Sequence, residues 1–131
     1  MQPRLLLDTH ILLRWLIETK KLSREQDRLL TAAIKRNEPV AISAITLLEI
    51  ALLVSGRKLK VELPEFLESV VGNPIFRILP LTAEVAVEMA YLAALVDLSD
   101  RTIVATARLH RLTLLTADER IIDSALVKTV S

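Results

Sequence analysis

The chain has 131 residues, and because 52% are hydrophobic but only 3% are aromatic, its core must be built from aliphatic side chains. Two glycines and five prolines are too few for a sandwich of many short strands, so helices with few breakers are favoured. The absence of cysteine excludes disulfides, zinc–thiolate sites and a thiol nucleophile. The net charge of +1 neither indicates nor excludes a nucleic-acid partner.

The first half of the chain begins with a short apolar run, Leu5–Leu7, which is typical of a strand covered on both faces. Ser23 is followed three residues later by Gln26, which is the spacing of a helix capping box. Ser43 is a suitable N-cap for a later helix. The sequence predicts, in order, helices over Thr9–Ile17 and residues 24–36, a strand over residues 40–42, a helix over Ala44–Ser55 that Gly56 ends, and a helix over residues 64–71.

The second half repeats the alternation of strands and helices. Thr116 and Glu119 have the spacing of another capping box, and either Asp97 or Ser99 caps the helix that ends at His110. The predicted elements are a strand over Phe76–Leu79, a helix capped by Thr82 that runs to about residue 95, the helix to His110, a strand over Thr113–Leu115, a short helix, and a strand over residues 125–130.

This alternation is the pattern of a parallel sheet covered by helices on both faces. We therefore predict one α/β domain over residues 1–131, with a central parallel sheet of about five strands. No apolar run approaches the ~18–20 residues of a membrane span, and no secretion signal is evident. A cytoplasmic protein without a membrane partner is expected.

Four acidic residues stand where the carboxyl ends of parallel strands would meet. Asp8 and Asp118 each follow a predicted strand, and Glu49 and Asp100 each lie on a helix that begins just upstream. Ligands of open α/β sheets usually bind at that edge. The plainer interpretation is that the three aspartates, like Asp97, cap helices or favour the helix dipole.

Glu49 is the most informative of these acids, because the predicted helix around it is apolar on nearly all sides. Desolvating a carboxylate there costs several kcal/mol unless it is paired or holds a metal. The alternatives are that Glu49 reaches solvent at one edge of the helix or pairs with an arginine.

Carboxylates brought together repel one another unless protons or cations intervene. Oxygen ligands without cysteine, and with only two histidines in the chain, suit Mg²⁺ or Mn²⁺ better than zinc. Such ions, held by clustered carboxylates, stabilise phosphate charge and generate hydroxide. The residues alone therefore indicate metal-assisted hydrolysis of a phosphate ester.

Four segments resemble, in order, the signature segments of the PIN domain, and most closely those of VapC-type toxins of prokaryotic toxin–antitoxin pairs. The segments are LDTH at residues 7–10, SAITLLEIA at residues 43–51, DRTIVATA at residues 100–107 and LTAD at residues 115–118. One departure is that the family often has an Asp-Pro pair just ahead of its Asp-Arg, whereas here Asp97 is followed by Leu98. The entrance of the active site is expected to differ accordingly.

The resemblance implies an endoribonuclease that uses Mg²⁺ or Mn²⁺, forms a homodimer and is covered by a cognate antitoxin protein. By motif match it implies that the catalytic and metal-binding residues are Asp8, Glu49, Asp100 and Asp118, with the hydroxyl groups of Thr9 and Thr116 nearby.

Three basic residues are candidate contacts to the RNA substrate. Arg57 and Lys58 belong to a basic stretch that could bind phosphates, although such stretches are more often solvated surface. Arg101 follows an acid of the predicted cluster, and it either pairs with one of these acids or contacts the substrate.

The alternative is a non-catalytic α/β regulatory or scaffolding module whose acids are helix caps. A phospho-receiver domain is the specific version, since it also gathers acids at a sheet edge. Such a domain needs an adjacent acid pair at its first strand, and Asp8 has no acidic neighbour.

Overall fold

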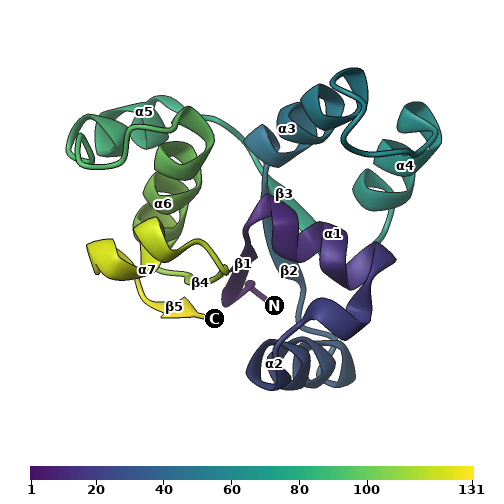
Figure 1. The fold of residues 1–131 in the computed structure, drawn as a ribbon. Coiled ribbons are helices and arrows are strands. Elements are labelled where there is room, and N and C mark those ends of the chain that lie inside the picture. The colour runs from purple at the N-terminus through teal and green to yellow at the C-terminus, as the bar shows by residue number, and fades with distance from the viewer.

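Five parallel strands form one sheet at the centre of the computed structural model, which describes residues 1–131 (Figure 1). The predicted parallel sheet is therefore confirmed, and its strand order is β3-β2-β1-β4-β5. The strands are β1 (Leu5–Leu7), β2 (Val40–Ser43), β3 (Phe76–Leu79), β4 (Thr113–Leu115) and β5 (Thr129–Val130).

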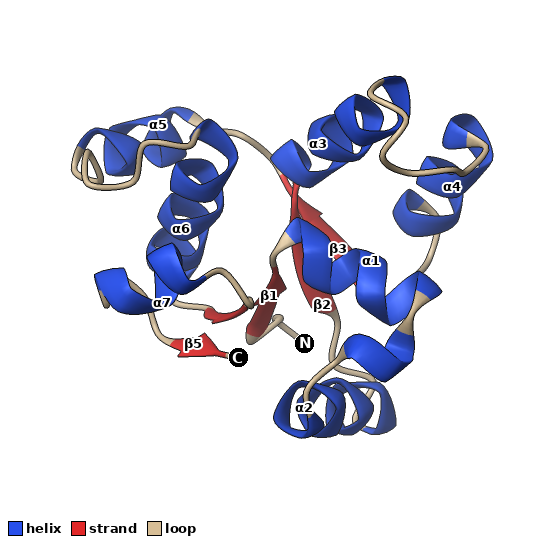
Figure 2. Cartoon of the chain, viewed as in Figure 1, coloured by secondary structure: helices blue, strands red, loops and turns tan.

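Helices cover both faces of this sheet, as the ribbon coloured by secondary structure shows (Figure 2). Helices α5, α6 and α7 lie on one side, and α1, α2 and α4 lie on the other. No helix is long and apolar enough to cross a membrane. The helices are α1 (Thr9–Ile17), α2 (Arg24–Lys35), α3 (Ala44–Ser55), α4 (Leu63–Val71), α5 (Ala83–Ala90), α6 (Leu98–His110) and α7 (Glu119–Ser124), with a 3-10 turn, η1 (Thr19–Lys21).

Strand β1 separates two hydrophobic cores because successive side chains of a strand point to opposite faces. Leu6 belongs to the core beneath α5, α6 and α7, whereas Leu5 and Leu7 belong to the core on the α1 side. All three side chains are buried, which explains why the strand is an unbroken apolar run rather than an alternating one.

The chain runs outward from β1 to β2 and β3 and then crosses to β4 on the other side of β1. The strand order therefore reverses beside β1, and the carboxyl ends of β1 and β4 diverge into different connections. This is the position at which open α/β sheets bind their ligands. Asp8 follows β1 at this point, and Thr116 follows β4.

Most of the predicted helix starts are confirmed. Ser23 and Gln26 form the complete capping box of α2, and Ser43 caps α3 by accepting a hydrogen bond from the Ile45 amide at 3.2 Å. Asp97 rather than Ser99 caps α6, because its carboxylate accepts the Asp100 amide at 2.9 Å.

Two predicted boundaries are wrong. The helix after Thr82 ends at Ala90 instead of continuing to about residue 95, because the chain then turns so that Leu92 and Leu95 enter the core. The last strand covers only Thr129–Val130 instead of residues 125–130, because Ala125 takes a left-handed conformation (φ 54°) that closes α7.

Gln26 also joins α2 to the last strand, since its amide donates to the carbonyls of Val130 at 3.0 Å and Thr116 at 3.4 Å. We expect Gln26→Ala to lower the free energy of unfolding by about 1–3 kcal/mol, because the buried amide that joins α2 to the carbonyls of Thr116 and Val130 is lost. Urea denaturation measures this loss. Thr31→Ala, at an exposed position of the same helix, is the control and should change stability by less than about 0.5 kcal/mol.

Candidate active site

The carboxylate of Asp8 lies at the end of the central strand and is only 6% exposed. Asp8 occupies the N-cap position of α1, but its side chain makes no capping hydrogen bond, so the interpretation of Asp8 as a side-chain helix cap is wrong. Instead, its Oδ2 accepts a hydrogen bond from the Thr116 hydroxyl at 2.8 Å. Burial raises the pKa of Asp8, and the Thr116 hydroxyl and the nearby His10 partly offset that rise.

The Thr116 hydroxyl connects two of the predicted site acids. It donates to Asp8 and accepts the backbone amide of Asp118 at 3.0 Å. The predicted capping box of Thr116 with Glu119 is wrong, because Asp118 is the N-cap of α7 and accepts the Arg120 amide at 2.9 Å. The Thr116 side chain is buried, and its two hydrogen bonds hold Asp8 and the backbone of Asp118 in place.

Glu49 projects from α3 and is partly buried. Its Oε1 atom is inaccessible to solvent and has no hydrogen-bond partner. One turn earlier on the same helix, the Thr46 hydroxyl bonds to the buried Thr9 hydroxyl at 2.9 Å. Thr9 therefore ties α1 to α3. The buried Oε1 of Glu49 lowers the stability of the fold, because a buried carboxylate oxygen without a hydrogen-bond partner has lost its hydration without compensation.

Asp100 lies in the first turn of α6, and its side chain is 14% exposed. Burial raises its pKa to about 7, and the negative charges of Asp118, Asp97 and Asp8 contribute to the same rise. Its carboxylate caps no helix, since Asp97 performs that role. Asp100 is thus a carboxylate held in the field of three others.

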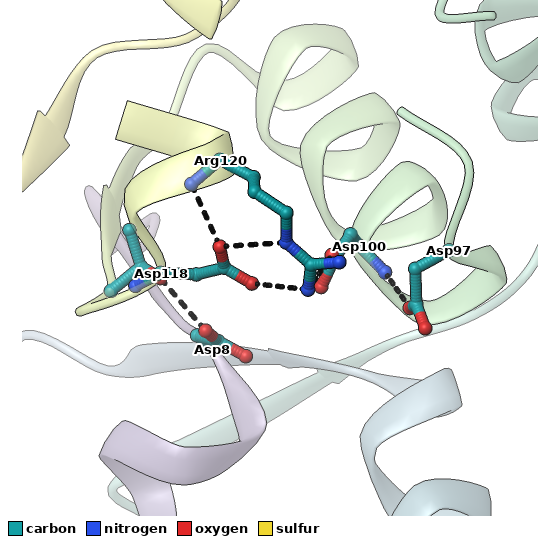
Figure 3. A network of polar contacts seen from close by, with 6 residues as sticks. Asp8, Asp97, Asp100, Asp118 and Arg120 are labelled. Carbon is teal, nitrogen blue, oxygen red and sulfur yellow. Dashed lines mark hydrogen bonds and ion pairs between the residues drawn. The ribbon is translucent and has the colours of Figure 1, made fainter. Parts of the chain in front are cut away.

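The guanidinium of Arg120 lies between two of these acids (Figure 3). One of its terminal nitrogens donates to Asp118 Oδ2 at 3.1 Å and to Asp100 Oδ2 at 3.3 Å. Its Nε donates to Asp118 Oδ1 at 3.3 Å, and hydrogen bonding from Arg120 lowers the pKa of Asp118. Arg120 is the counter-ion of this part of the site.

All four predicted site acids line one cleft of about 350 Å³. Its two arginines were not predicted from the sequence. Arg14 stands four residues after His10 on α1, a spacing that puts both on one helical face, and Arg120 stands two residues after Asp118. The cleft is lined by Asp8, His10, Arg14, Glu49, Asp97, Asp100, Ala117, Asp118 and Arg120.

The donor set of the cleft suits a hard divalent cation, because every predicted ligand is a carboxylate. The Oε1 of Glu49 is a buried carboxylate oxygen without a hydrogen-bond partner. As arranged, however, no group of three or more acidic, histidine or cysteine side chains is positioned to hold a metal ion. The ligand chemistry therefore fits, while the side chains must move to coordinate an ion.

The three candidate substrate contacts lie outside this cleft. Arg101 donates from Nε to the Leu95 carbonyl at 2.7 Å and from a terminal nitrogen to the Ala93 carbonyl at 3.5 Å, so it holds the segment after α5. Lys58 lines a second cavity of about 360 Å³, whereas Arg57 is exposed with a left-handed backbone (φ 59°). The two cavities share His10 and Arg14 along their walls.

The PIN domain family model matches residues 5–125, which is nearly the whole chain and includes every acid of the cleft. The chain belongs to the PIN domain family. The resemblance seen in the four sequence segments is confirmed, and PIN domains are nucleases. Among curated proteins, none matches this chain.

Several solved structures share the fold over nearly the whole chain. FitAcB from Neisseria gonorrhoeae is 26% identical, with a TM-score of 0.66 and coverage of 97% of this chain and 96% of that one. A toxin–antitoxin complex from Klebsiella pneumoniae is also 26% identical, with a TM-score of 0.66 and coverage of 96% and 95%. VapBC2 from Rickettsia felis bound to a promoter DNA fragment shares 17% identity, with a TM-score of 0.70 and coverage of 99% and 98%.

The raised pKa of Asp100 makes stability without metal depend on pH. The folded chain holds this proton more tightly than the unfolded chain, so stability falls as pH rises from about 4 to about 7. We expect Asp100→Asn to raise Tm at pH 8 by roughly 3–5 °C, the equivalent of ~1 kcal/mol after allowance for solvent screening.

The gain should shrink toward pH 4.5, where Asp100 is protonated in the folded native chain. Thermal denaturation in EDTA at both pH values measures it. Asp123→Asn, which removes an exposed acid of α7 outside the cleft, is the control. A lower Tm of Asp100→Asn at pH 8 would show that the carboxylate is structural rather than in repulsion.

Proposed function

We propose that this PIN domain is an endoribonuclease that depends on Mg²⁺ or Mn²⁺, and that it is the VapC-type toxin of a type II toxin–antitoxin pair in the cytoplasm. The observation that carries the proposal is the buried Oε1 of Glu49, which has no hydrogen-bond partner in a cleft lined by four further acids. In a structural or regulatory module, an unpaired buried carboxylate oxygen would only lower stability. In a metal site, the bound cation is the missing partner of that oxygen.

The four acids would hold the ion, and a bound ion supplies an activated water and stabilises phosphate charge. The chain's own residues prepare that chemistry. Thr116 orients the Asp8 carboxylate from the neighbouring strand, and the Thr9–Thr46 hydrogen bond holds the helix that carries Glu49. Asp118 supports the cluster from the N-terminus of α7.

The surroundings of the cleft favour a substrate that carries several phosphate groups, as RNA does. The second cavity has Arg14, Lys21 and Lys58 on its wall, together with Glu18, which pairs with Lys21, and it shares His10 and Arg14 with the acidic cleft. Cationic side chains beside a hydrolytic site bind the phosphates that flank the bond to be cut. Lys58 is thus a substrate contact in this proposal, and Arg57 an outer one.

An antitoxin partner is supported by the similar structures, which include a toxin–antitoxin complex at 26% identity over nearly the same length. We also propose that the chain forms a homodimer, which the size of the purified chain in solution tests. A co-expressed antitoxin should suppress the ribonuclease activity, because access of RNA to the cleft is then blocked.

The purified chain should cleave RNA in Mg²⁺ or Mn²⁺ and stop in EDTA. Asp8→Asn and Glu49→Gln should each reduce the cleavage rate by roughly 10²-fold or more, because each removes a charged ligand of the ion that would activate water and stabilise the phosphate charge. Gel analysis of a labelled single-stranded RNA measures the rate. Glu119→Gln, at an exposed position outside the cleft, is the matched control and should keep the native rate.

Thermal denaturation of each variant verifies that it is folded. Cleavage that persists in EDTA or in both acid variants would contradict the proposed metal site. Mg²⁺ binding by the native chain without hydrolysis of any RNA would favour a non-catalytic module.

The RNA contact at the second cavity has its own test. Lys58→Gln should raise KM for RNA about 2–5-fold with little change in kcat, because it removes one phosphate contact and leaves the acids intact. Lys35→Gln on α2, which lines neither of the two cavities, is the control. An unchanged KM would remove Lys58 from the substrate path.

A further inference from the structure

We propose that Arg120 is an exchangeable counter-ion: without a divalent ion it neutralises Asp100 and Asp118, and when the ion takes these carboxylates it turns to the RNA phosphate. The proposal rests on the proposed function and assigns a role to a residue outside the predicted site. It explains why the acids of the cleft have the chemistry of metal ligands but are not arranged to hold an ion in this structure.

The contacts of Arg120 place it where the ion would bind. Its guanidinium takes both oxygens of Asp118 and Oδ2 of Asp100, which lie on α7 and α6 respectively (Figure 3). A carboxylate oxygen that accepts a guanidinium hydrogen bond is not free to enter a tight coordination shell with the same lone pair. Arg120 and a divalent ion therefore compete for the same ligand atoms.

The exchange is physically easy because Arg120 is held loosely. Its side chain is 73% exposed, and all its side-chain hydrogen bonds go to these two aspartates. Exposed ion pairs contribute little to stability, so a doubly charged ion displaces the guanidinium readily. The side chain is long and flexible, and once released it remains at the rim of the cleft.

The released guanidinium fits what the substrate brings. Its planar set of donors matches the oxygens of a phosphate and can bind two of them at once. The ion has then replaced the positive charge that Arg120 gave to the acids, and RNA brings a new negative charge to the same rim. Arg120 is therefore a positioning residue for substrate in the metal-bound enzyme.

Arg14 provides a matched control for the charge itself. It lines the same cleft but forms no ion pair with any acid. Removing either arginine lowers the positive charge of the cleft by one, but only Arg120 occupies ligand oxygens. A difference between the two variants therefore isolates direct competition from general electrostatics.

Mn²⁺ binding without RNA tests the first half of the proposal. Isothermal titration of Arg120→Gln should give a Kd about 2–5-fold lower than that of the native chain, since two weak pairs no longer compete with the ion. Arg14→Gln should give a clearly smaller change. A Kd that is unchanged in Arg120→Gln, or that falls equally in both variants, would overturn direct competition.

Steady-state cleavage at saturating Mn²⁺ tests the second half. Arg120→Gln should raise KM for RNA several-fold more than it changes kcat, and Arg120→Lys should recover part of the loss because it keeps the charge without the planar donors. The expected result is that Arg120→Gln binds Mn²⁺ more tightly and RNA more weakly than the native chain does. An unchanged KM would overturn the phosphate contact.

These outcomes separate the inference from the proposed function. A native chain that cleaves no RNA would overturn the proposed function together with the phosphate contact, while the Mn²⁺ titration would still decide the counter-ion role. A native chain that cleaves RNA, with Arg120→Gln equal to it in both assays, would overturn the inference alone.

Discussion

The burial of one carboxylate at the end of the central strand is the constraint on which the site depends. Asp8 is buried directly after the central strand β1, and its hydrogen bond comes from Thr116, which directly follows β4, the neighbouring strand that pairs with β1. The Asp8 amide continues that pairing by donating to the Leu115 carbonyl at 3.0 Å. The central acid is therefore placed by sheet register, and the surrounding loops mainly add charge.

The chain accepts an unfavourable concentration of negative charge around that point. Burial and neighbouring acids raise the pKa of Asp100, and Glu49 keeps an oxygen without a partner. Native proteins bury polar groups in this way mainly where function requires it, because each unpaired atom lowers stability. Arg120 relieves part of the repulsion from outside, through contacts that solvent weakens. The acids of the cleft are thus neutralised only in part, and the Oε1 of Glu49 remains without a hydrogen-bond partner.

The strands and helices could be predicted from the sequence, although the strand order could not, because unbroken apolar runs and helix caps are local signals. Asp8 and Glu49 could also be predicted as site residues, because each is an acid among apolar neighbours. The end of α5 could not, since Leu92 continues the helical stripe yet is buried through a turn. Thr116 was misassigned because its spacing to Glu119 imitates a capping box, whereas its real partner is 108 residues away. Arg120 carried no local signal of its role, which depends on the start of α7 lying near Asp100 in the first turn of α6.

The Asp-Arg pair at the start of α6 combines two unrelated duties in adjacent residues. Asp100 faces the cleft, while Arg101 turns away and binds the carbonyls of Leu95 and Ala93. In the proposed ribonuclease, a substitution of Arg101 would therefore lower activity by releasing the segment ahead of α6, since Arg101 does not line the cleft. Loss of function at the two positions should accordingly be interpreted separately. A substitution of Asp100 removes a carboxylate of the cleft, whereas a substitution of Arg101 frees the segment that contains Ala93 and Leu95. Stabilising substitutions elsewhere in the chain could compensate for the second loss but not for the first.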